Sequence, residues 1–509
     1  MTELQLHNSV TVVNSDNREA LTLIEDTCCL SYEYFVRWKG SARSLHKTRD
    51  LRYFTKKLPQ FPTGWTGKVT QQLRRHKIAY TISDLRLKPR KINLKILALP
   101  NNPWPHQEEA LKAIQEGERG IVRVPTRGGK TLIMALTIAY FNVRTVVMVP
   151  NKTLLEQEYE VFSEVFGAHQ VGRLGGGYFE IDKSIIVATI QTLASKANDL
   201  FVGLQIFRRT GCVIFDECHH VGHGGYTLRN TYFEVAQRCI GAYYRIGFTA
   251  TPGRTLSLER QLLTGVAGKL IYTIDIEQLT ERSILTPGRI DMVVLDRPHT
   301  PTLREFIEEQ GIEVPPRADL ELLCRKHHIL IPNLPDFRRQ LDDKITNNLE
   351  FRELVKFLAE YYASRGSSVI VLVSLVERGV IAFTQGEHAI QGAVGLSGQD
   401  KNRGEVLEDF KQNKFSVLVS TIVREGVDIP KADVIILASC DVQSGTPVLQ
   451  RMGRVLTAAE NKTQAIIVDF YIRDDGVLER HSKARMRLYD QNGFNINIIG
   501  EEEIAEMII

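Results

Sequence analysis

The sequence lacks the features of a membrane protein or of a disulfide-stabilised one. No run of about 18 apolar residues occurs along the 509 residues, so we expect no transmembrane helix. The start, Met1 to Gln5, has no basic segment followed by an apolar one and does not resemble a signal peptide. The seven cysteines are scattered and never spaced CxxC, which argues against a zinc site or a disulfide framework. These absences predict a cytoplasmic protein.

Acidic residues are scarce in one part of the chain. The net charge is only +4, but the stretch from Glu33 to Lys95 holds 17 Lys or Arg against 3 Asp or Glu. This stretch carries +14 and leaves −10 for the rest of the chain. A basic head on a mildly acidic body indicates a polyanion as the partner of the head, and we expect nucleic acid.

Repeats and low-complexity tracts are also absent, and a different pattern recurs after about Asn101. Short β-branched runs are each followed by polar or glycine residues and then by a helical stretch, which is typical of parallel strands covered on both faces. The runs are Ile121–Val124, Thr145–Val149, Ile185–Ala188, Cys212–Phe215, Val369–Val373, Val417–Val419, Val434–Leu437 and Ala465–Val468. They fall into two groups, so the fold class is α/β with two tandem lobes.

The expected domains are a small basic nucleic-acid-binding domain over residues 1–95 and two lobes over 96–282 and 283–509. The proline-rich stretch 297–343 has little pattern, and we expect an insertion in the second lobe there.

A candidate phosphate cradle follows the first run of the first lobe. Pro125 is followed by Thr126, Arg127, Gly128, Gly129, Lys130 and Thr131, and then by an apolar helix from Leu132 to Phe141. A strand, a glycine loop, Lys-Thr and a helix together point backbone amides at phosphates. Lys130 would meet the β/γ phosphates and Thr131 would hold Mg²⁺. Val124 stands where the usual pattern has its first Gly, and Arg127 occupies a position usually given to Gly. A surface turn before a buried helix is the alternative.

Two adjacent carboxylates end the run Cys212–Phe215. Phosphoryl transfer to water needs one carboxylate on the metal and another to orient the water. We expect Asp216 to hold Mg²⁺ and Glu217 to act as general base. A helix N-terminus stabilised by two acids is the alternative, and it is weakened by the cradle upstream.

Three further segments complete a nucleotide site and its coupling. Gln107 is a candidate adenine reader, because a Gln amide can pair with both N6 and N7 of adenine. Thr249 and Thr251 close another strand, and their hydroxyls could bond to the Asp216 region. In the second lobe Arg451 and Arg454 lie three residues apart on one helix face, which suits a γ-phosphate arriving from the opposite lobe. For any one of these residues alone, an ordinary surface position is the simpler interpretation.

The ordered set of motifs resembles superfamily 2 helicases over about Asn101 to Tyr471. The motifs are Gln107, Gly129-Lys130-Thr131, Pro150 through Leu154, Thr189 through Leu193, the DExH box of Asp216, Glu217 and His219, Thr249-Ala250-Thr251, Thr421 through Asp428, and Gln450 through Arg454. The resemblance implies two RecA-like domains, ATP and Mg²⁺ as cofactors, and nucleic-acid-dependent ATP hydrolysis. It also implies that Lys152, Thr153, Thr189 and Thr421 contact the nucleic-acid backbone. Asp428, Gln450, Arg451 and Arg454 would complete the ATP site, and His219, Thr249 and Thr251 would couple the two.

Within this superfamily, Asp216-Glu217-Cys218-His219-His220 and Gln450 through Arg454 look more like the DNA-processing branch around XPB, RecG and the phage helicase UvsW, with UvsW the closest. This implies work on branched DNA: fork regression, Holliday-junction branch migration and R-loop removal, with 3′→5′ movement and, for a phage protein, in the host cytoplasm. An RNA-directed helicase and a binding module with a degenerate ATPase are the alternatives.

The basic head mixes cations with aromatic residues. Candidate nucleic-acid contacts are Arg37, Lys39, Lys56 and Lys57, interleaved with Phe35, Trp38, Tyr53, Phe54, Phe61 and Trp65. This mixture suits both phosphates and base faces. The alternative for the aromatic residues, which we favour slightly, is that they form a small core.

Overall fold

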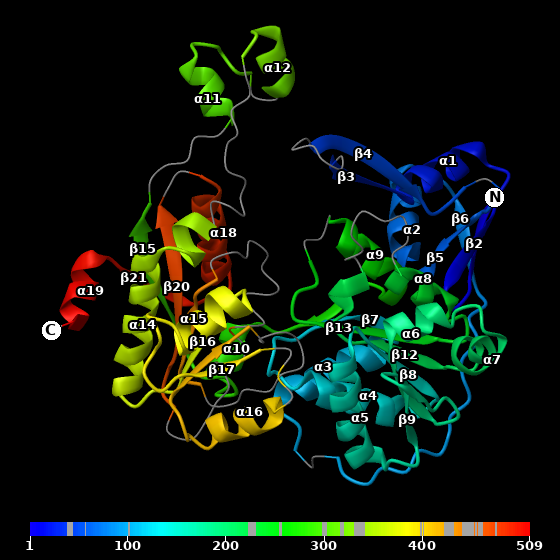
Figure 1. Cartoon of the computed structure of the whole chain (residues 1–509). Coiled ribbons are helices and arrows are strands. Elements are labelled where there is room, and N and C mark those ends of the chain that lie inside the picture. The colour runs from blue at the N-terminus through cyan, green and yellow to red at the C-terminus, as the bar shows by residue number, and fades with distance from the viewer. Residues whose placement is uncertain are drawn as a thin grey trace. The chain divides into compact units, whose positions relative to one another are not determined.

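The computed structural model describes most of the chain and divides it into two compact units, Met1–Asp275 and Ile276–Ile509 (Figure 1). The described residues are 1–37, 44–55, 57–99, 102–221, 231–253, 257–297, 303–315, 320–329, 342–397, 400, 402–421, 432–439, 452, 456, 462–473 and 476–508. Each unit is described by itself. Among these residues, no helix has the length and apolar character that crossing a membrane requires.

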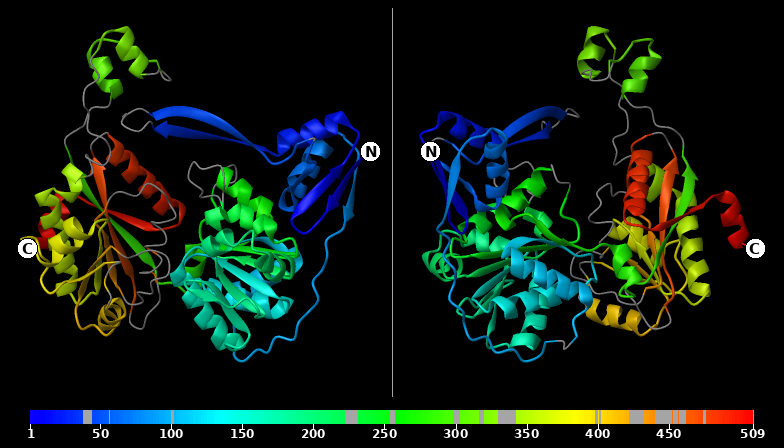
Figure 2. Two further views of the ribbon diagram at one scale, coloured as in Figure 1. Left: turned by 45° about the vertical axis from the view of Figure 1, so that its right-hand side comes forward. Right: turned by 180° about the vertical axis from the view of Figure 1, so that it is seen from behind.

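The N-terminal segment, residues 1–84, has a small mixed sheet of its own. Its strands are β1 (Thr2–Leu6), β2 (Val10–Asn14), β5 (Gln60–Pro62) and β6 (Tyr80–Asp84), in the order β5-β2-β1-β6. Helices α1 (Arg18–Thr27) and α2 (Thr66–Arg75) pack together beside it. Strands β3 (Cys29–Arg37) and β4 (Ser44–Arg52) form a separate antiparallel ribbon that reaches away from this sheet (Figure 2).

The aromatic residues of this segment form a core rather than a base-stacking surface. Phe54, Phe61 and Trp65 are each 1 % exposed. Tyr53 packs edge-on against Trp65 and also against Phe233, with ring centroids 5.2 and 5.1 Å apart. These rings are therefore not available to stack on bases. Of the other candidates, the side chains of Phe35 and Trp38 lie outside the described residues.

This segment shares its core with the first lobe, residues 102–275. One cluster of buried side chains runs from Leu4 to Ala267. The Trp65 indole donates to the Gln261 carbonyl at 2.7 Å. Gly64 lies so close to helix α9 (Leu258–Ala267) that an added Cβ would stand 2.0 Å from the Thr264 oxygen. The N-terminal segment and the first lobe therefore form one packed unit.

The first lobe is built on an eight-stranded sheet in the order β10-β9-β11-β8-β12-β13-β7-β14. The strands are β7 (Arg119–Arg123), β8 (Thr145–Val149), β9 (Val171–Gly175), β10 (Tyr178–Phe179), β11 (Ile185–Thr189), β12 (Cys212–Phe215), β13 (Tyr244–Thr249) and β14 (Leu270–Thr273). All neighbours are parallel except β10 and β9. The central strands β8, β11 and β12 are buried at every residue, as expected when helices cover both faces.

Helices cover this sheet in two layers. One layer consists of α3 (Pro105–Gly117), α4 (Lys130–Phe141) and α5 (Lys152–Phe166), which pack side by side (Figure 1). The other contains α6 (Ile190–Ser195), α8 (Thr231–Arg238) and α9. The parallel order brings the carboxyl ends of β7, β8, β11, β12 and β13 to one edge of the sheet, where the loops with candidate site residues begin.

The second unit holds a parallel sheet in the order β17-β18-β16-β19-β20-β15-β21. Its strands are β15 (Gly288–Asp296), β16 (Val369–Leu372), β17 (Val394–Leu396), β18 (Val417–Ser420), β19 (Val434–Leu437), β20 (Ala465–Arg473) and β21 (Asn495–Ile499). The longer helices around it are α14 (Leu349–Ser364), α16 (Arg403–Lys411), α18 (Val477–Gln491) and α19 (Glu501–Ile508). The α/β class expected from the sequence is confirmed, and all eight β-branched runs are strands.

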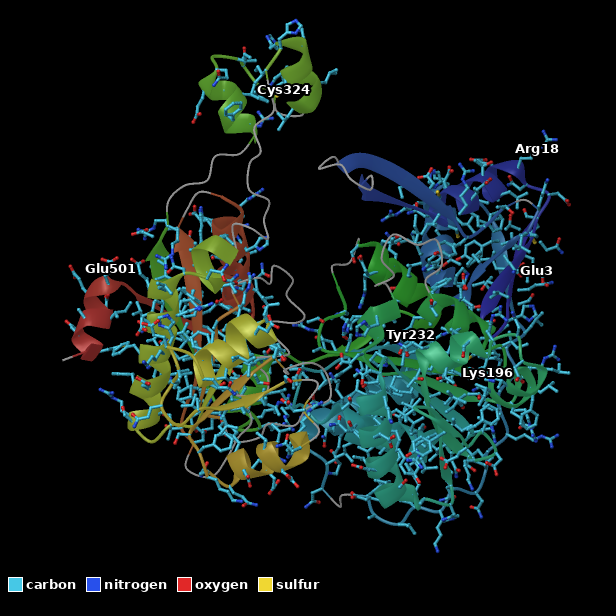
Figure 3. The ribbon with its side chains drawn as sticks, viewed as in Figure 1. Glu3, Arg18, Lys196, Tyr232, Cys324 and Glu501 are labelled. Atoms are coloured by element: carbon cyan, nitrogen blue, oxygen red, sulfur yellow. The ribbon has the colours of Figure 1, made fainter. Side chains whose placement is uncertain are left out.

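The proline-rich stretch follows β15 and contains helical structure that its sequence did not predict. Helices α11 (Leu303–Glu309) and α12 (Leu320–Lys326) pack around Ile307, Val314 and Cys324. Cys324 is fully buried in this pair (Figure 3). These helices have a small core of their own, separate from the core of the second sheet.

Candidate nucleotide and nucleic-acid site

The loop between β7 and α4 forms a glycine turn that ends at Lys130, the first residue of α4. Gly129 caps the helix with φ of 77°, and Arg127 has φ of 69°. A positive φ is costly for a residue with a Cβ, so Arg127 holds strained backbone where Gly would be relaxed. Val124 takes the place of the usual first Gly because it extends the sheet: its N–H donates to the Thr249 oxygen at 3.1 Å.

Helix α3 braces this loop through two adjacent side chains. The His106 ring contacts the Gly128 carbonyl oxygen at 2.7 Å. The Gln107 carboxamide accepts from the Trp104 N–H at 2.9 Å, and its nitrogen lies against Gly129, where an added Cβ would stand 2.2 Å away. Gln107 is 1 % exposed. Gln107 therefore positions the cradle directly, and its role as an adenine reader stays a prediction.

The cradle lysine meets the DExH box. The Lys130 ammonium donates to Glu217 Oε1 at 2.9 Å, and the two side chains are 12 % and 10 % exposed. Glu217 has φ of 42°, a second strained position at the carboxyl edge of the sheet. Because the pair is buried, its two charges interact more strongly than in an exposed pair, and loss of either one would destabilise the other.

The environment of the site shifts the pKa values of Glu217 and Asp216 in opposite directions. Burial would raise the pKa of Glu217, but Lys130 and His219 hold it below its usual value. Burial and the neighbouring Glu217 raise the pKa of Asp216 to about 6. Lys130 has a raised pKa despite its burial, because Glu217 and Asp216 stabilise the ammonium. Neighbouring carboxyls with shifted pKa values are common at functional sites.

The residues that we expect to hold Mg²⁺ have the chemistry of a cation site. Asp216 is 3 % exposed, and its Oδ1 is buried without a hydrogen-bond partner. A buried carboxylate oxygen with no donor needs a compensating cation, and oxygen is the ligand that Mg²⁺ prefers. Thr131 follows Lys130 in the first turn of α4.

A chain of polar contacts leads from Glu217 to the next loop. His219 Nδ1 lies 3.4 Å from Glu217 Oε2 and 3.0 Å from the Thr249 hydroxyl. The same hydroxyl accepts from the Thr251 N–H at 3.0 Å. The structure therefore brings together the three residues expected to couple nucleotide to nucleic acid, and Thr249 contacts the DExH box through His219.

The site contains a third buried acid that the sequence analysis missed. Glu158, on α5, is 2 % exposed and lies beside Asp216. Burial and the nearby Asp216 raise the pKa of Glu158 well above its usual value. Tyr232, labelled in Figure 3, donates to the Asp216 and Met148 carbonyl oxygens at 3.1 and 3.0 Å. A glutamate on a helix face carries no sequence signal for this placement.

Two of the expected backbone contacts, Lys152 and Thr189, meet at the carboxyl edge beside a glycine turn. Gly175, Gly176 and Gly177 all have positive φ and join β9 to β10. A Cβ on Gly175 would stand 2.4 Å from the Thr189 hydroxyl, and one on Gly176 would stand 3.2 Å from Lys152 carbons. The run of three glycines is the signal in the sequence for this turn.

The remaining expected contacts are scattered. Thr153 is exposed at the start of α5, Lys57 is exposed in the N-terminal segment, and Thr421 is half-buried just after β18. Arg37 is described only as backbone of β3. Lys39, Lys56, Asp428, Gln450, Arg451 and Arg454 lie outside the described residues, so their roles stay predictions.

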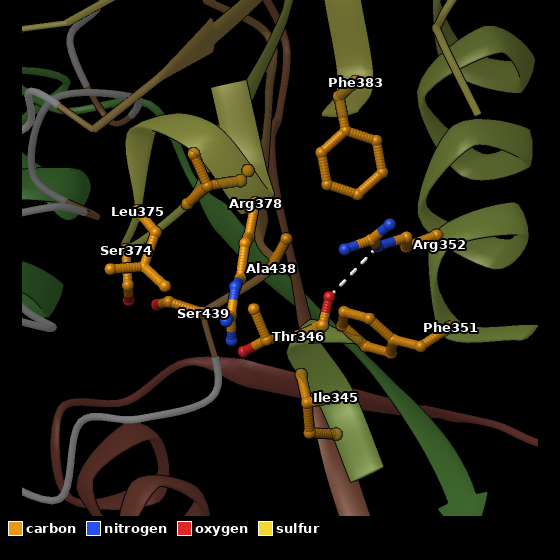
Figure 4. A pocket seen from close by; sticks show the side chains of 12 residues that line it. Ile345, Thr346, Phe351, Arg352, Ser374, Leu375, Arg378, Phe383, Ala438 and Ser439 are labelled. Carbon is orange, nitrogen blue, oxygen red and sulfur yellow. Dashed lines mark hydrogen bonds between the residues drawn. The ribbon is translucent and has the colours of Figure 1, made fainter. Parts of the chain in front are cut away.

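The described part of the second unit contains a small pocket at the carboxyl ends of β16 and β19 (Figure 4). Its wall includes Arg352, whose guanidinium donates to the Thr346 carbonyl at 3.0 Å, and Arg378. The pocket encloses only about 20 Å³, which is room for a water molecule rather than a ligand.

Two family models match the two units. Residues 101–254 match the model of the type III restriction enzyme res subunit. Residues 337–507 match the ERCC3/RAD25/XPB C-terminal helicase. The chain belongs to the superfamily 2 helicases. Its expected place near XPB is supported by the DNA 3′-5′ translocase XPB2 of Sulfurisphaera tokodaii, which is 25 % identical over 373 residues, covering 71 % of this chain and 80 % of that protein.

Two solved structures align with this chain. The type ISP restriction-modification enzyme LlaBIII bound to DNA aligns over 86 % of this helicase and 34 % of that chain, with 15 % identity and a TM-score of 0.56. T4 UvsW aligns over 98 % of this chain and 99 % of its own, with 17 % identity, but its TM-score of 0.39 is too low to support an argument. The helicase therefore has tandem RecA-like domains, and its family implies ATP use and nucleic-acid-dependent ATPase activity.

Proposed function

We propose that this helicase is an ATP-driven translocase on branched or duplex DNA that moves 3′→5′. The name of the XPB2 relative, a DNA 3′-5′ translocase, supports the choice of DNA and of direction. The observation that carries the proposal is the continuous series of contacts from Lys130 through Glu217 and His219 to Thr249. It joins a phosphate-binding lysine to a loop at the same edge as the candidate nucleic-acid contacts.

In this proposal, the Lys130–Glu217 pair controls the activation of water for ATP hydrolysis. Without nucleotide, Lys130 neutralises Glu217 and keeps its pKa low. Triphosphate oxygens would attract Lys130, and Glu217 would then lose the cation that lowers its pKa. A carboxylate of higher pKa accepts a proton from water more readily, so phosphate binding would itself prepare the base.

Other residues hold the reactants. Thr131 and Asp216 would hold Mg²⁺, whose charge would offset that of the phosphate oxygens. Arg451 and Arg454 of the second unit would approach the γ-phosphate, with Gln450 and Asp428 beside them. Lys152, Thr153, Thr189 and Thr421 would contact one nucleic-acid strand.

A substrate panel tests the proposal. We expect phosphate release to be stimulated by DNA, and ATP-dependent strand displacement to be faster on a fork, a four-way junction or an R-loop than on an RNA duplex. Lys130→Ala is the control and should abolish both signals. Preferred displacement of the RNA duplex would assign the protein to RNA instead, and phosphate release that no nucleic acid stimulates would refute the motor.

A further inference from the structure

A broad groove lies at the edge of the first sheet opposite the nucleotide site. Arg144 comes just before β8, Ser184 just before β11, and Thr210 and Gly211 just before β12, so all four mark the amino ends of parallel strands. The linker, residues 85–99, runs along this edge and forms the other wall. The groove has a volume of about 670 Å³.

Cations from three separate segments line the groove. They are Lys88 and Arg90 of the linker, Arg144, and Arg208 with Arg209 at the end of the helical segment before β12. Lys88 pairs with Glu118 at 3.0 Å, and Arg209 donates to the Gln205 carboxamide at 3.0 Å. Arg90 and Arg208 are exposed, and neither has a carboxylate partner among the described residues. Positive charge is therefore in excess at this edge.

The groove is preformed, because its walls are fixed by close packing and by hydrogen bonds. A Cβ on Gly211 would stand 2.5 Å from Pro89, so glycine is what lets the linker approach here. The Asn8 side chain accepts from the Leu87 N–H at 3.2 Å and donates to the Gly241 oxygen at 3.1 Å. The Ile92 N–H donates to the Asn142 oxygen at 2.8 Å. A ligand would find the wall in place and would not have to order it.

Two polar groups of this wall lack partners in the described structure. The Thr210 hydroxyl belongs to a fully buried residue, and Arg144 Nε is also buried, yet neither makes a hydrogen bond. Arg144 itself is half-buried, and burial together with the nearby Arg209 lowers its pKa. Crowded cations along a groove favour an anion with several charges.

The residues that line the groove also indicate which class of anion would bind. It contains no aromatic residue, so it has no platform on which an unpaired base could stack. Five of its 14 lining residues are Lys or Arg, whereas a small-molecule site usually has only a few polar groups. Guanidinium groups spread over three segments match a row of phosphates. We propose that this groove binds the phosphate backbone of a duplex DNA segment, without reading its sequence.

This binding site extends the proposed function, on which it rests only for the choice of DNA over other polyanions. The nucleotide residues Lys130 and Asp216 follow the carboxyl ends of β7 and β12, whereas the groove lies at the amino ends. A duplex arm held in the groove would therefore not touch the nucleotide. The site would add affinity for DNA with duplex arms and would leave the chemical step unchanged.

The test compares matched triple variants of the full chain. Arg90→Gln, Arg208→Gln and Arg209→Gln together remove three exposed cations of the groove. The control removes three exposed lysines elsewhere in the first unit, Lys112→Gln, Lys196→Gln and Lys269→Gln (Lys196 is labelled in Figure 3). Binding of a blunt 30-base-pair duplex is measured at several salt concentrations. The groove variant should bind less tightly, and its salt slope should fall by about one for each phosphate that it no longer neutralises.

Two further measurements make the outcome decisive. A third variant, with lysine at the same three groove positions, should keep most of the affinity, and phosphate release with short single-stranded DNA should be unchanged in the groove variant. Equal reductions in affinity in the groove variant and its control, or none in either, would overturn the proposal. If the wild type shows no DNA-stimulated hydrolysis but the groove variant still binds duplex more weakly, the groove stands and the proposed motor function fails.

Discussion

The two edges of the first sheet use charge in opposite ways. At the carboxyl edge, Lys130 and Glu217 are nearly buried and paired at 2.9 Å, and Asp216 is buried beside them. At the amino edge, Arg90 and Arg208 are exposed and have no carboxylate partner in the described chain. The same strands therefore carry a buried ion pair at one end and exposed, unpaired cations at the other.

The difference in how the charges are buried suits the function that we propose for each edge. Charges in a low-dielectric site interact strongly at short range, which suits a reaction that must be switched on by one ligand. Exposed cations act over about 10 Å and are screened by salt, which suits attraction of a long polyanion. The comparison predicts that changes at one edge leave the function of the other intact.

The largest effect should come from Glu217→Gln. Glutamine keeps the shape of the side chain but cannot accept a proton from the attacking water, so DNA-stimulated phosphate release should fall by about 10²–10⁴-fold. Binding of a blunt duplex should remain within twofold of wild type, because the groove lies at the other edge. Hydrolysis within tenfold of wild type would exclude Glu217 as the base, and a changed salt slope for duplex binding would show that the two edges are not independent.

A medium effect, on stability, should come from Glu158→Gln. The folded protein raises the pKa of Glu158 above its unfolded value, so between the two values the folded state binds more protons than the unfolded state. Stability from this group is present at low pH and is lost as pH rises toward the folded pKa. Glutamine mimics the protonated form and avoids this loss. We therefore expect the Tm of the variant to exceed that of wild type by a margin that grows from pH 5 to pH 8.

The measurement is calorimetry without nucleotide and with EDTA. Glu156→Gln, on the same helix, is the control for loss of one negative charge. Glu156 contacts Arg173 at 3.1 Å, and its side chain is 31 % exposed. The prediction is wrong if the Tm difference between Glu158→Gln and wild type does not grow with pH, or if it grows equally for Glu156→Gln. Burial of Glu158 would then not account for the pH dependence of stability.

The sequence predicted the fold well because strands buried on both faces leave a strong signal. Val146, Val213 and Ile435 lie in continuous β-branched runs, and each run is a strand of one of the two sheets. The structure of the insertion was not predicted, because its many prolines argue against helices, yet two short helices pack around Cys324. The N-terminal segment was expected to be a separate domain. The structure shows that Trp65 packs onto α9, so this segment shares its core with the first lobe.

The site was predictable only where its residues are adjacent in the chain. Lys130 and Thr131, or Asp216 and Glu217, form short motifs whose chemistry can be inferred from spacing. Glu158 and the basic groove could not be found in this way, because their parts come together only through the parallel order of the sheet. Lys88 and Arg208, for example, are far apart in sequence and line one groove.

The smallest effect should come from Arg127→Gly, which probes the strain at the carboxyl edge. Arg127 has φ of 69°, and a side chain at such an angle costs on the order of 1 kcal/mol that glycine avoids. Arg127→Ala is the matched comparison, because it also removes the guanidinium but keeps the Cβ. We expect the glycine variant to be more stable than the alanine variant by up to about 1 kcal/mol in the free energy of unfolding, which is a Tm difference of up to about 2 °C for a unit of this size. If alanine is as stable as glycine, the loop adopts this conformation without cost, and Arg127 carries no backbone strain.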